Sequence, residues 1–489
     1  MLRKVAVIGL DGLSWKVLHD LLSKGAMPYL NSIIESSAKG ILKSTIPPTT
    51  PPAWTSITSG VNPGKHGIYD FVKLTSNYQT KIVTSLDVRY PRIHEMIALM
   101  GLETVSINMP FTFPILKIEK STIVSDWIGP KICFFPKKVE TYMKKYKPYS
   151  LSVSSPEKLY KETKNRAESI NTLMNEIEWN LFFVIFMEPD HLMHRYGIPP
   201  VRTRIEKHYY KIFTEIDKTI ENASKIADLL IILSDHGFSE YQYRININSY
   251  LAKLGFTTGT NRSLVKGITD LKTKKRKVEI KIPPFLYKFI VAHESMKKFV
   301  KRVYRLLIGK DLTSKWPRPD PEKSKAFSPT IESCGVYVKD KLLIDTILLE
   351  LKKLKGIQQV WKREAIYHGP YVNLAPHIIF QPNFDDGFTV GSVLMTPLIF
   401  SRGKFYWHHP DGIFILHGKN VHSGWISYVH TVDIVPTILR YMGLPLPIDT
   451  DGKPLSNIDY PRKQVEYYDY LKQWKLIRQI QLKKSKLAI

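Results

Sequence analysis

The chain has 489 residues, 43% of them hydrophobic, and carries a formal net charge of +27 at pH 7. This length and apolar content favour a globular protein with a main domain and one insertion. No run of eighteen apolar residues occurs, so the sequence predicts no membrane-spanning helix. The two cysteines, Cys133 and Cys334, lie far apart, which argues against a disulfide framework and against a cysteine-based metal motif.

The first residues, MLRKVAVIGLDGL, combine a short basic start with a brief apolar run before Asp11. That run is shorter than the apolar core of a signal peptide. We therefore interpret it as a buried strand and expect an intracellular, cytoplasmic protein.

Apolar runs alternate with helical patterns along the chain, which is typical of α/β proteins. Continuous apolar runs predict strands buried on both faces of a mostly parallel central sheet that is flanked by helices. Helices are expected at residues 15–22 and 430–443. Strands are expected at residues 4–10, 102–110, 180–190, 228–237 and 411–418.

The composition changes after about residue 241. Between residues 271 and 315 there are fourteen Lys or Arg and three Asp or Glu. We interpret residues 241–325 as a basic insertion that caps the site, within a core formed by residues 1–240 and 326–460. Residues 461–489 are predicted to be a basic, helical tail. No interleaved aromatic motif accompanies the charge, so nucleic acid is not expected as a partner other than as a substrate.

Three of the predicted strands end directly in acidic residues, namely Asp11, Asp190 and Asp235. Ligands of open α/β sheets bind outside the carboxyl ends of the strands. A surface carboxylate would explain any one of these residues. Three of them together favour a binding site at that edge of the sheet.

Histidines accompany the carboxylates. Asp190 and His194 are four residues apart, so one helical turn would direct both side chains to a common point. Asp235 precedes His236 directly, and His408 and His409 come just before another predicted strand. Such a set of oxygen and nitrogen donors without cysteine suits two ions of Zn, Mn or Fe better than Ca or Mg.

A proline-rich stretch, IPPTTPPAW, places Thr50 directly before Pro51 and Pro52. The residue before proline is extended, and proline is favoured in the first turn of a helix, so Thr50 is expected at a helix N-terminus. The free N–H groups there favour an anion. Thr50 by itself would be interpreted as an N-cap. Beside two metal ions it is interpreted as a nucleophile, because metal coordination activates a hydroxyl group.

These motifs and their order resemble the type I phosphodiesterase/nucleotide pyrophosphatase family of the alkaline phosphatase superfamily. The resemblance implies an alkaline-phosphatase-like fold. It is weakest in the basic insertion and the tail. The matching segments are VIGLDGL, MPYLNSI, PPTTPPAWTSITSGVNPGKHGIYDF, SINMPFTFP, FMEPDHLMH, SDHGF, WHHPDGIFI and TVDIVPTILRYMGLPLPIDTDGKPL.

The resemblance also implies roles for individual residues. Thr50 would attack phosphorus and form a phosphothreonine that water then hydrolyses. His66 would pack the nucleophile loop without binding metal. Zinc is the favoured metal, and one ion would be held by Asp190, His194 and His408. The other would be held by Asp11, Asp235, His236 and the oxygen of Thr50.

Two of these assignments have alternatives. For the last metal ligand, His409 is the second choice after His408. His417 is the third choice, because it falls inside or beyond the strand. Thr49 is the second choice for the nucleophile, since Thr50 takes the position directly before the proline pair.

The sequence therefore predicts a two-metal phosphoric-ester hydrolase that acts on an anionic small-molecule ester, with diesters favoured. A phosphomonoesterase, phosphonate hydrolase, phosphomutase or phosphotransferase with the same core is the first alternative. The second is a basic protein that binds nucleic acid or anionic lipid through a degenerate core. The sequence makes no prediction of the oligomeric state.

Overall fold

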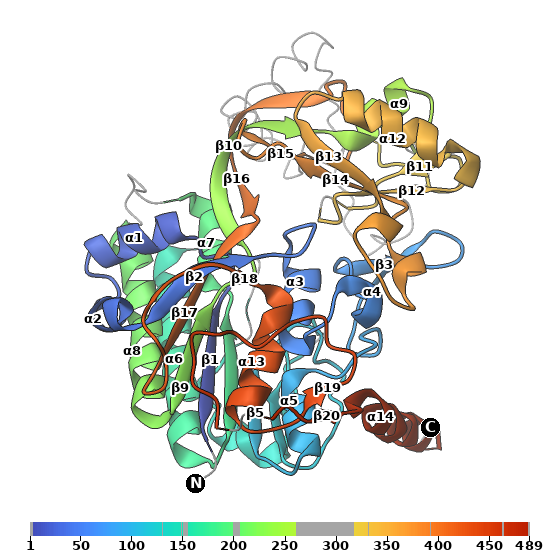
Figure 1. Cartoon of the computed structure of the whole chain (residues 1–489). Coiled ribbons are helices and arrows are strands. Elements are labelled where there is room, and N and C mark those ends of the chain that lie inside the picture. The colour runs from blue at the N-terminus through green and yellow to red at the C-terminus, as the bar shows by residue number, and fades with distance from the viewer. Residues whose placement is uncertain are drawn as a thin grey trace, which may run out of the picture.

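A nine-stranded sheet forms the centre of the computed structural model (Figure 1). Its strand order is β18-β2-β17-β9-β1-β8-β5-β6-β7, and the run from β9 to β6 is parallel. The structure describes residues 3–129, 131–147, 149, 155–198, 206–260, 317–330, 332–391, 393–461 and 464–487. The strands are β1 (Val5–Leu10), β2 (Ala38–Lys43), β5 (Thr104–Ile107), β6 (Ser121–Val124), β7 (Phe134–Phe135), β8 (Leu181–Phe186), β9 (Leu229–Leu233), β17 (Asp411–Gly418) and β18 (Gly424–His430).

Both faces of this sheet are covered because its central strands are apolar on both sides. All six residues of β1 are buried, and alternate side chains enter two separate cores. One core packs against α1 (Trp15–Ser23), α2 (Pro28–Ile33), α6 (Pro156–Glu176) and α8 (Glu206–Ile226). The other packs against α3 (Thr50–Ser59), α5 (Ile93–Leu99) and α13 (Ile434–Tyr441). The predicted α/β class with a mostly parallel, helix-flanked sheet is confirmed.

A smaller lobe lies beyond the carboxyl ends of the parallel strands (Figure 1). It has its own hydrophobic core, a three-stranded sheet in the order β15-β10-β16 and a four-stranded sheet in the order β11-β12-β14-β13. Its helices are α9 (Ile247–Lys253) and α12 (Ile344–Lys353). Its strands are β10 (Gly237–Ile245), β11 (Ala326–Phe327), β12 (Gly335–Val338), β13 (Ile357–Lys362), β14 (Ile378–Pro382), β15 (Phe388–Val390) and β16 (Phe400–His409).

The described part of this lobe includes residues 241–260 and 317–325 of the predicted insertion, residues 241–325, and continues beyond both of its ends. Residues 261–316, which include most of its positive charge, lie outside the described residues. The predicted boundaries at residues 241 and 325 therefore stay a prediction. The segment after residue 461 contains β20 (Tyr467–Tyr468), which pairs with β19 (Leu446–Pro447), and helix α14 (Tyr470–Leu487). Among the described residues, no helix is both long and apolar enough to cross a membrane.

The pair β10 and β16 links the lobe to the central sheet. The two strands are antiparallel, and their register pairs Gly237 with His409 and Phe238 with His408. β10 begins directly after His236, and β17 of the central sheet follows β16. Strand pairing over a distance of about 170 residues therefore brings His408 to the end of β9.

Candidate metal centre and active site

The acidic residues predicted to gather at one sheet edge do so. Asp11 directly follows β1, and Asp235 follows β9 after one residue. Asp190 lies in the first turn of α7 (Glu188–Tyr196), which follows β8. Because β9, β1 and β8 are adjacent and parallel, their carboxyl ends lie side by side, and so do these three carboxylates.

One donor cluster consists of Asp190, His194 and His408. His194 Nε2 lies 3.0 Å from His408 Nε2 and 3.2 Å from Asp190 Oδ1. His408 Nε2 lies 3.4 Å from the same oxygen. Ligand atoms bound tetrahedrally at about 2.0 Å from one ion are separated by about 3.3 Å. The three atoms therefore match one face of a tetrahedral metal site.

The second cluster consists of Asp11, Asp235 and His236. His236 Nε2 lies 3.4 Å from Asp235 Oδ2 and 3.8 Å from Asp11 Oδ1. His236 Nδ1 lies 3.0 Å from the carbonyl oxygen of Gly237. A proton on Nδ1 donates to that carbonyl and leaves the Nε2 lone pair directed at the carboxylates, as a metal ligand requires.

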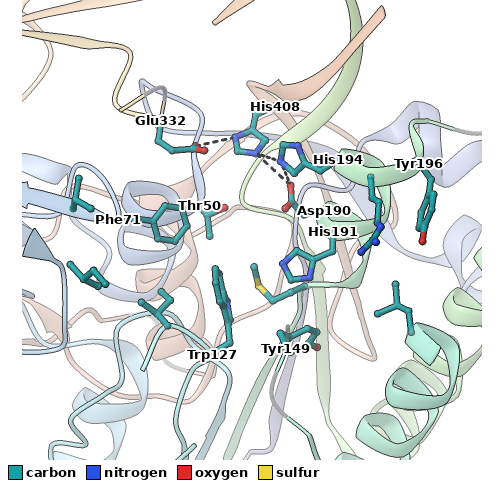
Figure 2. Close-up of a pocket in the computed structure, with 16 residues that line it drawn as sticks. Thr50, Phe71, Trp127, Tyr149, Asp190, His191, His194, Tyr196, Glu332 and His408 are labelled. Atoms are coloured by element: carbon teal, nitrogen blue, oxygen red, sulfur yellow. Dashed lines mark hydrogen bonds and ion pairs between the residues drawn. The ribbon is translucent and has the colours of Figure 1, made fainter. Parts of the chain in front are cut away.

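Thr50 lies at this second cluster. It is the first residue of α3, is 3% exposed, and its Oγ1 lies 3.3 Å from His236 Nε2. The N-cap position belongs to Thr49, and neither threonine caps the helix with its side chain. Figure 2 shows Thr50 directed toward the cavity that Asp190 and His408 also line. The N-cap interpretation therefore does not describe the Thr50 side chain.

The electrostatics of the two clusters favour bound cations. Burial, together with repulsion from the neighbouring carboxylates, raises the pKa of Asp11 well above its usual range. Burial likewise raises the pKa of Asp235. Three buried oxygens, Asp11 Oδ1, Asp190 Oδ1 and Asp235 Oδ2, have no hydrogen-bond partner among the described residues. Buried acceptors of this kind fit positive ions, since a partner is otherwise required.

The alternatives considered in the sequence lie elsewhere. His409 Nδ1 accepts from the backbone N–H of Asp411, 3.2 Å away, and its ring lies beside Phe384. His417 Nδ1 lies 3.1 Å from Ser37 Oγ. His66 is fully buried and bonded to Ser56 Oγ at 3.0 Å, which agrees with a packing role.

A comparison of the sequence with profiles of protein families identifies the family. The profile of the type I phosphodiesterase/nucleotide pyrophosphatase family matches residues 5–327, about two thirds of the chain. The chain belongs to this family. The match covers every residue of the two clusters except His408. A sequence search of curated proteins finds no significant match to this phosphodiesterase-family chain.

Several solved structures have the same fold as this chain, although their sequences are only about 15% identical to it. An inactive variant of murine ectonucleotide pyrophosphatase/phosphodiesterase 5 with AMP is 15% identical, with a TM-score of 0.54 and 92% and 97% of the two chains covered. Phosphonoacetate hydrolase from Sinorhizobium meliloti with phosphonoformate is 15% identical, with a TM-score of 0.53 and 89% and 94% covered. Alkaline phosphatase PafA is 14% identical, with a TM-score of 0.51 and 94% and 99% covered.

A carboxylate that the sequence reasoning missed lies next to the first cluster. Glu332, from the smaller lobe of the phosphodiesterase-family chain, has its Oε2 atom 3.9 Å from His408 Nδ1 (Figure 2). Both atoms are buried without a hydrogen-bond partner among the described residues. Burial, with a smaller contribution from Asp70, raises the pKa of Glu332 to about 8. Glu332 lies outside the quoted motifs, so no local signal marked it.

Glu332→Gln is expected to weaken metal binding by less than about 10-fold, because Glu332 lies near the outer nitrogen of His408, 3.9 Å away, without a hydrogen bond to it. Metal content after dialysis against graded chelator concentrations measures this effect. Glu322→Gln, an exposed position of the same lobe, is the matched control. Equal metal retention in the two variants would contradict the role assigned to Glu332.

A buried ion pair supports the helix that carries Asp190 and His194. Arg166 of α6 and Glu188 of α7 are both fully buried, and Arg166 Nε donates to Glu188 Oε1 at 2.9 Å. Tyr149 donates its hydroxyl to Glu188 Oε2 at 2.7 Å, and the Arg166 guanidinium lies 4.1 Å from the centre of the Tyr149 ring. The pair therefore ties α6 to the first turn of α7.

Arg166→Met is expected to lower the free energy of unfolding by about 3–5 kcal/mol, because it leaves the carboxylate of Glu188 buried without its charge partner. Urea unfolding followed by circular dichroism measures this change. Lys145→Met removes the exposed ion pair with Glu168 and should cost less than about 1 kcal/mol. Similar decreases in the free energy of unfolding for both substitutions would show that the buried ion pair stabilises the protein no more than the exposed one.

Proposed function

We propose that the protein is a two-metal phosphoric-ester hydrolase with Thr50 as its nucleophile. The observation that carries the proposal is the position of the Thr50 hydroxyl, within 3.3 Å of one three-donor cluster and in the same cavity as the other. Membership of the phosphodiesterase family supports the reaction class.

Each cluster supplies one ion-binding site in this proposal. Asp190, His194 and His408 hold one ion, and Asp11, Asp235, His236 and the Thr50 oxygen hold the other. Divalent ions held there would supply the positive charge that eases loss of the Thr50 hydroxyl proton and offsets negative charge on the phosphoryl group. Histidine and aspartate donors without cysteine favour zinc, with manganese and iron as the next choices.

The Thr50 side chain then carries the reaction in two steps. The Thr50 hydroxyl releases its proton to water as its oxygen bonds to phosphorus, the bond from phosphorus to the leaving ester oxygen breaks, and the leaving oxygen takes a proton from water. A water molecule next attacks the phosphothreonine, the phosphorus–Oγ bond breaks, and the Thr50 hydroxyl regains its proton. Five of the six donor residues are buried, which holds them in place, so little reorganisation accompanies the charge movement.

A diester is the proposed substrate class. Diesters carry one negative charge fewer on the phosphoryl group than ionised monoesters do. Among the described residues that line the cavity, Arg195 is the only Lys or Arg. A lining so poor in cations suits the less charged ester. Diester preference and the choice of metal ion are therefore tested together.

The deciding experiment removes metal, restores Zn or Mn, and compares hydrolysis of bis-p-nitrophenyl phosphate with that of p-nitrophenyl phosphate. Metal-dependent turnover with preference for the diester is the expected result. Preference for the monoester would retain the site and overturn the substrate class. Failure to bind metal at all would favour instead the basic binding protein with a degenerate core.

A further inference from the structure

A large cavity opens beside the nucleophile. Its volume is about 1000 Å³, at the upper end of the range for small-molecule sites. Thr50, Asp190 and His408 line its inner end, and nine of its sixteen lining residues are apolar or aromatic. Such a space is far larger than a phosphoryl group needs. The remaining space is available to the group esterified to the phosphate.

We propose that this cavity binds a bulky hydrocarbon chain esterified to the phosphate, rather than a nucleoside or a second phosphate. The proposal rests on the proposed phosphoric-ester hydrolase function and names its substrate class. It is carried by an aromatic wall, by the engagement of the Tyr149 hydroxyl behind that wall, and by an apolar hairpin at the mouth.

The aromatic wall consists of Phe71, Trp127, His191 and Tyr149 (Figure 2). Ring centres lie 6.0 Å apart for Phe71 and Trp127, 5.9 Å for Trp127 and His191, and 5.9 Å for His191 and Tyr149. Neighbouring rings are inclined by 58°, 81° and 78°. Neighbouring rings inclined in this way leave no parallel slot between them for a flat base. The wall offers instead a continuous apolar surface.

The Tyr149 hydroxyl, a polar atom of this wall, is engaged behind it. It donates to Glu188, which is held by Arg166, so the ring and not the hydroxyl serves the cavity. A sugar or a base edge needs buried hydrogen-bond partners, and unpaired polar groups on either side would cost affinity. A second phosphate needs cations, and Arg195 is the only one on the described lining. A hydrocarbon chain needs neither.

The mouth of the cavity continues this apolar surface. The hairpin of β3 (Val72–Leu74) and β4 (Thr80–Ile82) pairs Val72 with Ile82, and both residues line the cavity. Ile82 is 63% exposed, so its side chain offers apolar surface to a ligand at this position. A chain leaving the cavity over this hairpin would cover Ile82 and gain further apolar burial.

The test uses metal-loaded enzyme and p-nitrophenyl diesters whose second ester group is methyl, propyl, hexyl or 5′-thymidyl. All four release p-nitrophenol, so differences in kcat/KM report the second group. We expect kcat/KM to rise about 30- to 1000-fold from methyl to hexyl, the upper value corresponding to full burial of the added methylenes. The hexyl ester should also exceed the thymidyl ester.

Ile82→Asp adds a site-specific arm. It should lower the hexyl-to-methyl ratio of kcat/KM at least tenfold, whereas Leu342→Asp, at a position 89% exposed in the smaller lobe and outside the cavity lining, should leave the ratio unchanged. Equal rates for all alkyl esters, or fastest turnover of the thymidyl ester, would overturn the hydrocarbon proposal and leave the hydrolase function intact. No metal-dependent turnover of any of the four esters would overturn the hydrolase function itself.

Discussion

Thr50→Ala is expected to abolish ester hydrolysis, with a fall in kcat of roughly 10³- to 10⁶-fold, while both metal ions stay bound. The loss follows because the substitution removes the atom that bonds to phosphorus, and removal of a nucleophile gives effects of this size. Metal binding should persist because three side chains remain in each cluster. Hydrolysis of bis-p-nitrophenyl phosphate together with metal analysis of the same sample measures both quantities.

Two variants complete this experiment. Thr50→Ser keeps a hydroxyl group and should retain measurable turnover, and Thr49→Ala, which changes the neighbouring N-cap residue, should stay within a few-fold of the parent protein. Brief incubation with substrate followed by acid quenching should trap phosphate on the peptide that contains Thr50. Full activity in Thr50→Ala, or loss of activity in Thr49→Ala alone, would show that Thr50 is not the nucleophile.

Asp190→Asn and Asp235→Asn are expected to lose one metal ion each and to reduce turnover by at least about 10³-fold. The two residues belong to different clusters, and each contributes a buried oxygen without a hydrogen-bond partner among the described residues. An asparagine keeps the size of the side chain but removes the charge that the ion requires, so the effect reports metal binding more than packing.

Metal-to-protein ratios by plasma mass spectrometry decide the outcome. Asp217→Asn is the control, because Asp217 is also buried but accepts hydrogen bonds from the backbone of Tyr29 and Leu30, away from both clusters. It should retain both ions. Retention of two ions by the Asp190 and Asp235 variants would exclude the clusters as the metal sites, even if activity were lost.

Local sequence determined much of the architecture. Continuous apolar runs predicted strands that are buried on both faces. The structure contains these strands as β1, β8 and β9. The spacing of four between Asp190 and His194 placed both on one side of a helix, because an α-helix turns once in 3.6 residues. Strand ends that carry Asp11 and Asp235 converged because neighbouring parallel strands end at the same edge.

The choice between His408 and His409 needed the tertiary structure. Both residues end β16, where successive side chains point to opposite faces, so only one can reach the clusters. Register against β10 pairs Phe238 with His408, and the His408 ring stacks on His236 with centres 3.9 Å apart. That pairing joins segments that are far apart in the chain. From the sequence, the preference for His408 over His409 therefore rested on the family resemblance.

Sequence by itself determined the fold class, the family and the donors that lie within a few residues of a strand end, because each depends on local periodicity or spacing. Only the tertiary structure brought Glu332 to His408 and assembled Phe71, Trp127 and Tyr149 into one wall beside Thr50. These residues come from separate loops and from the smaller lobe. Their proximity results from packing between distant segments, which no local pattern encodes.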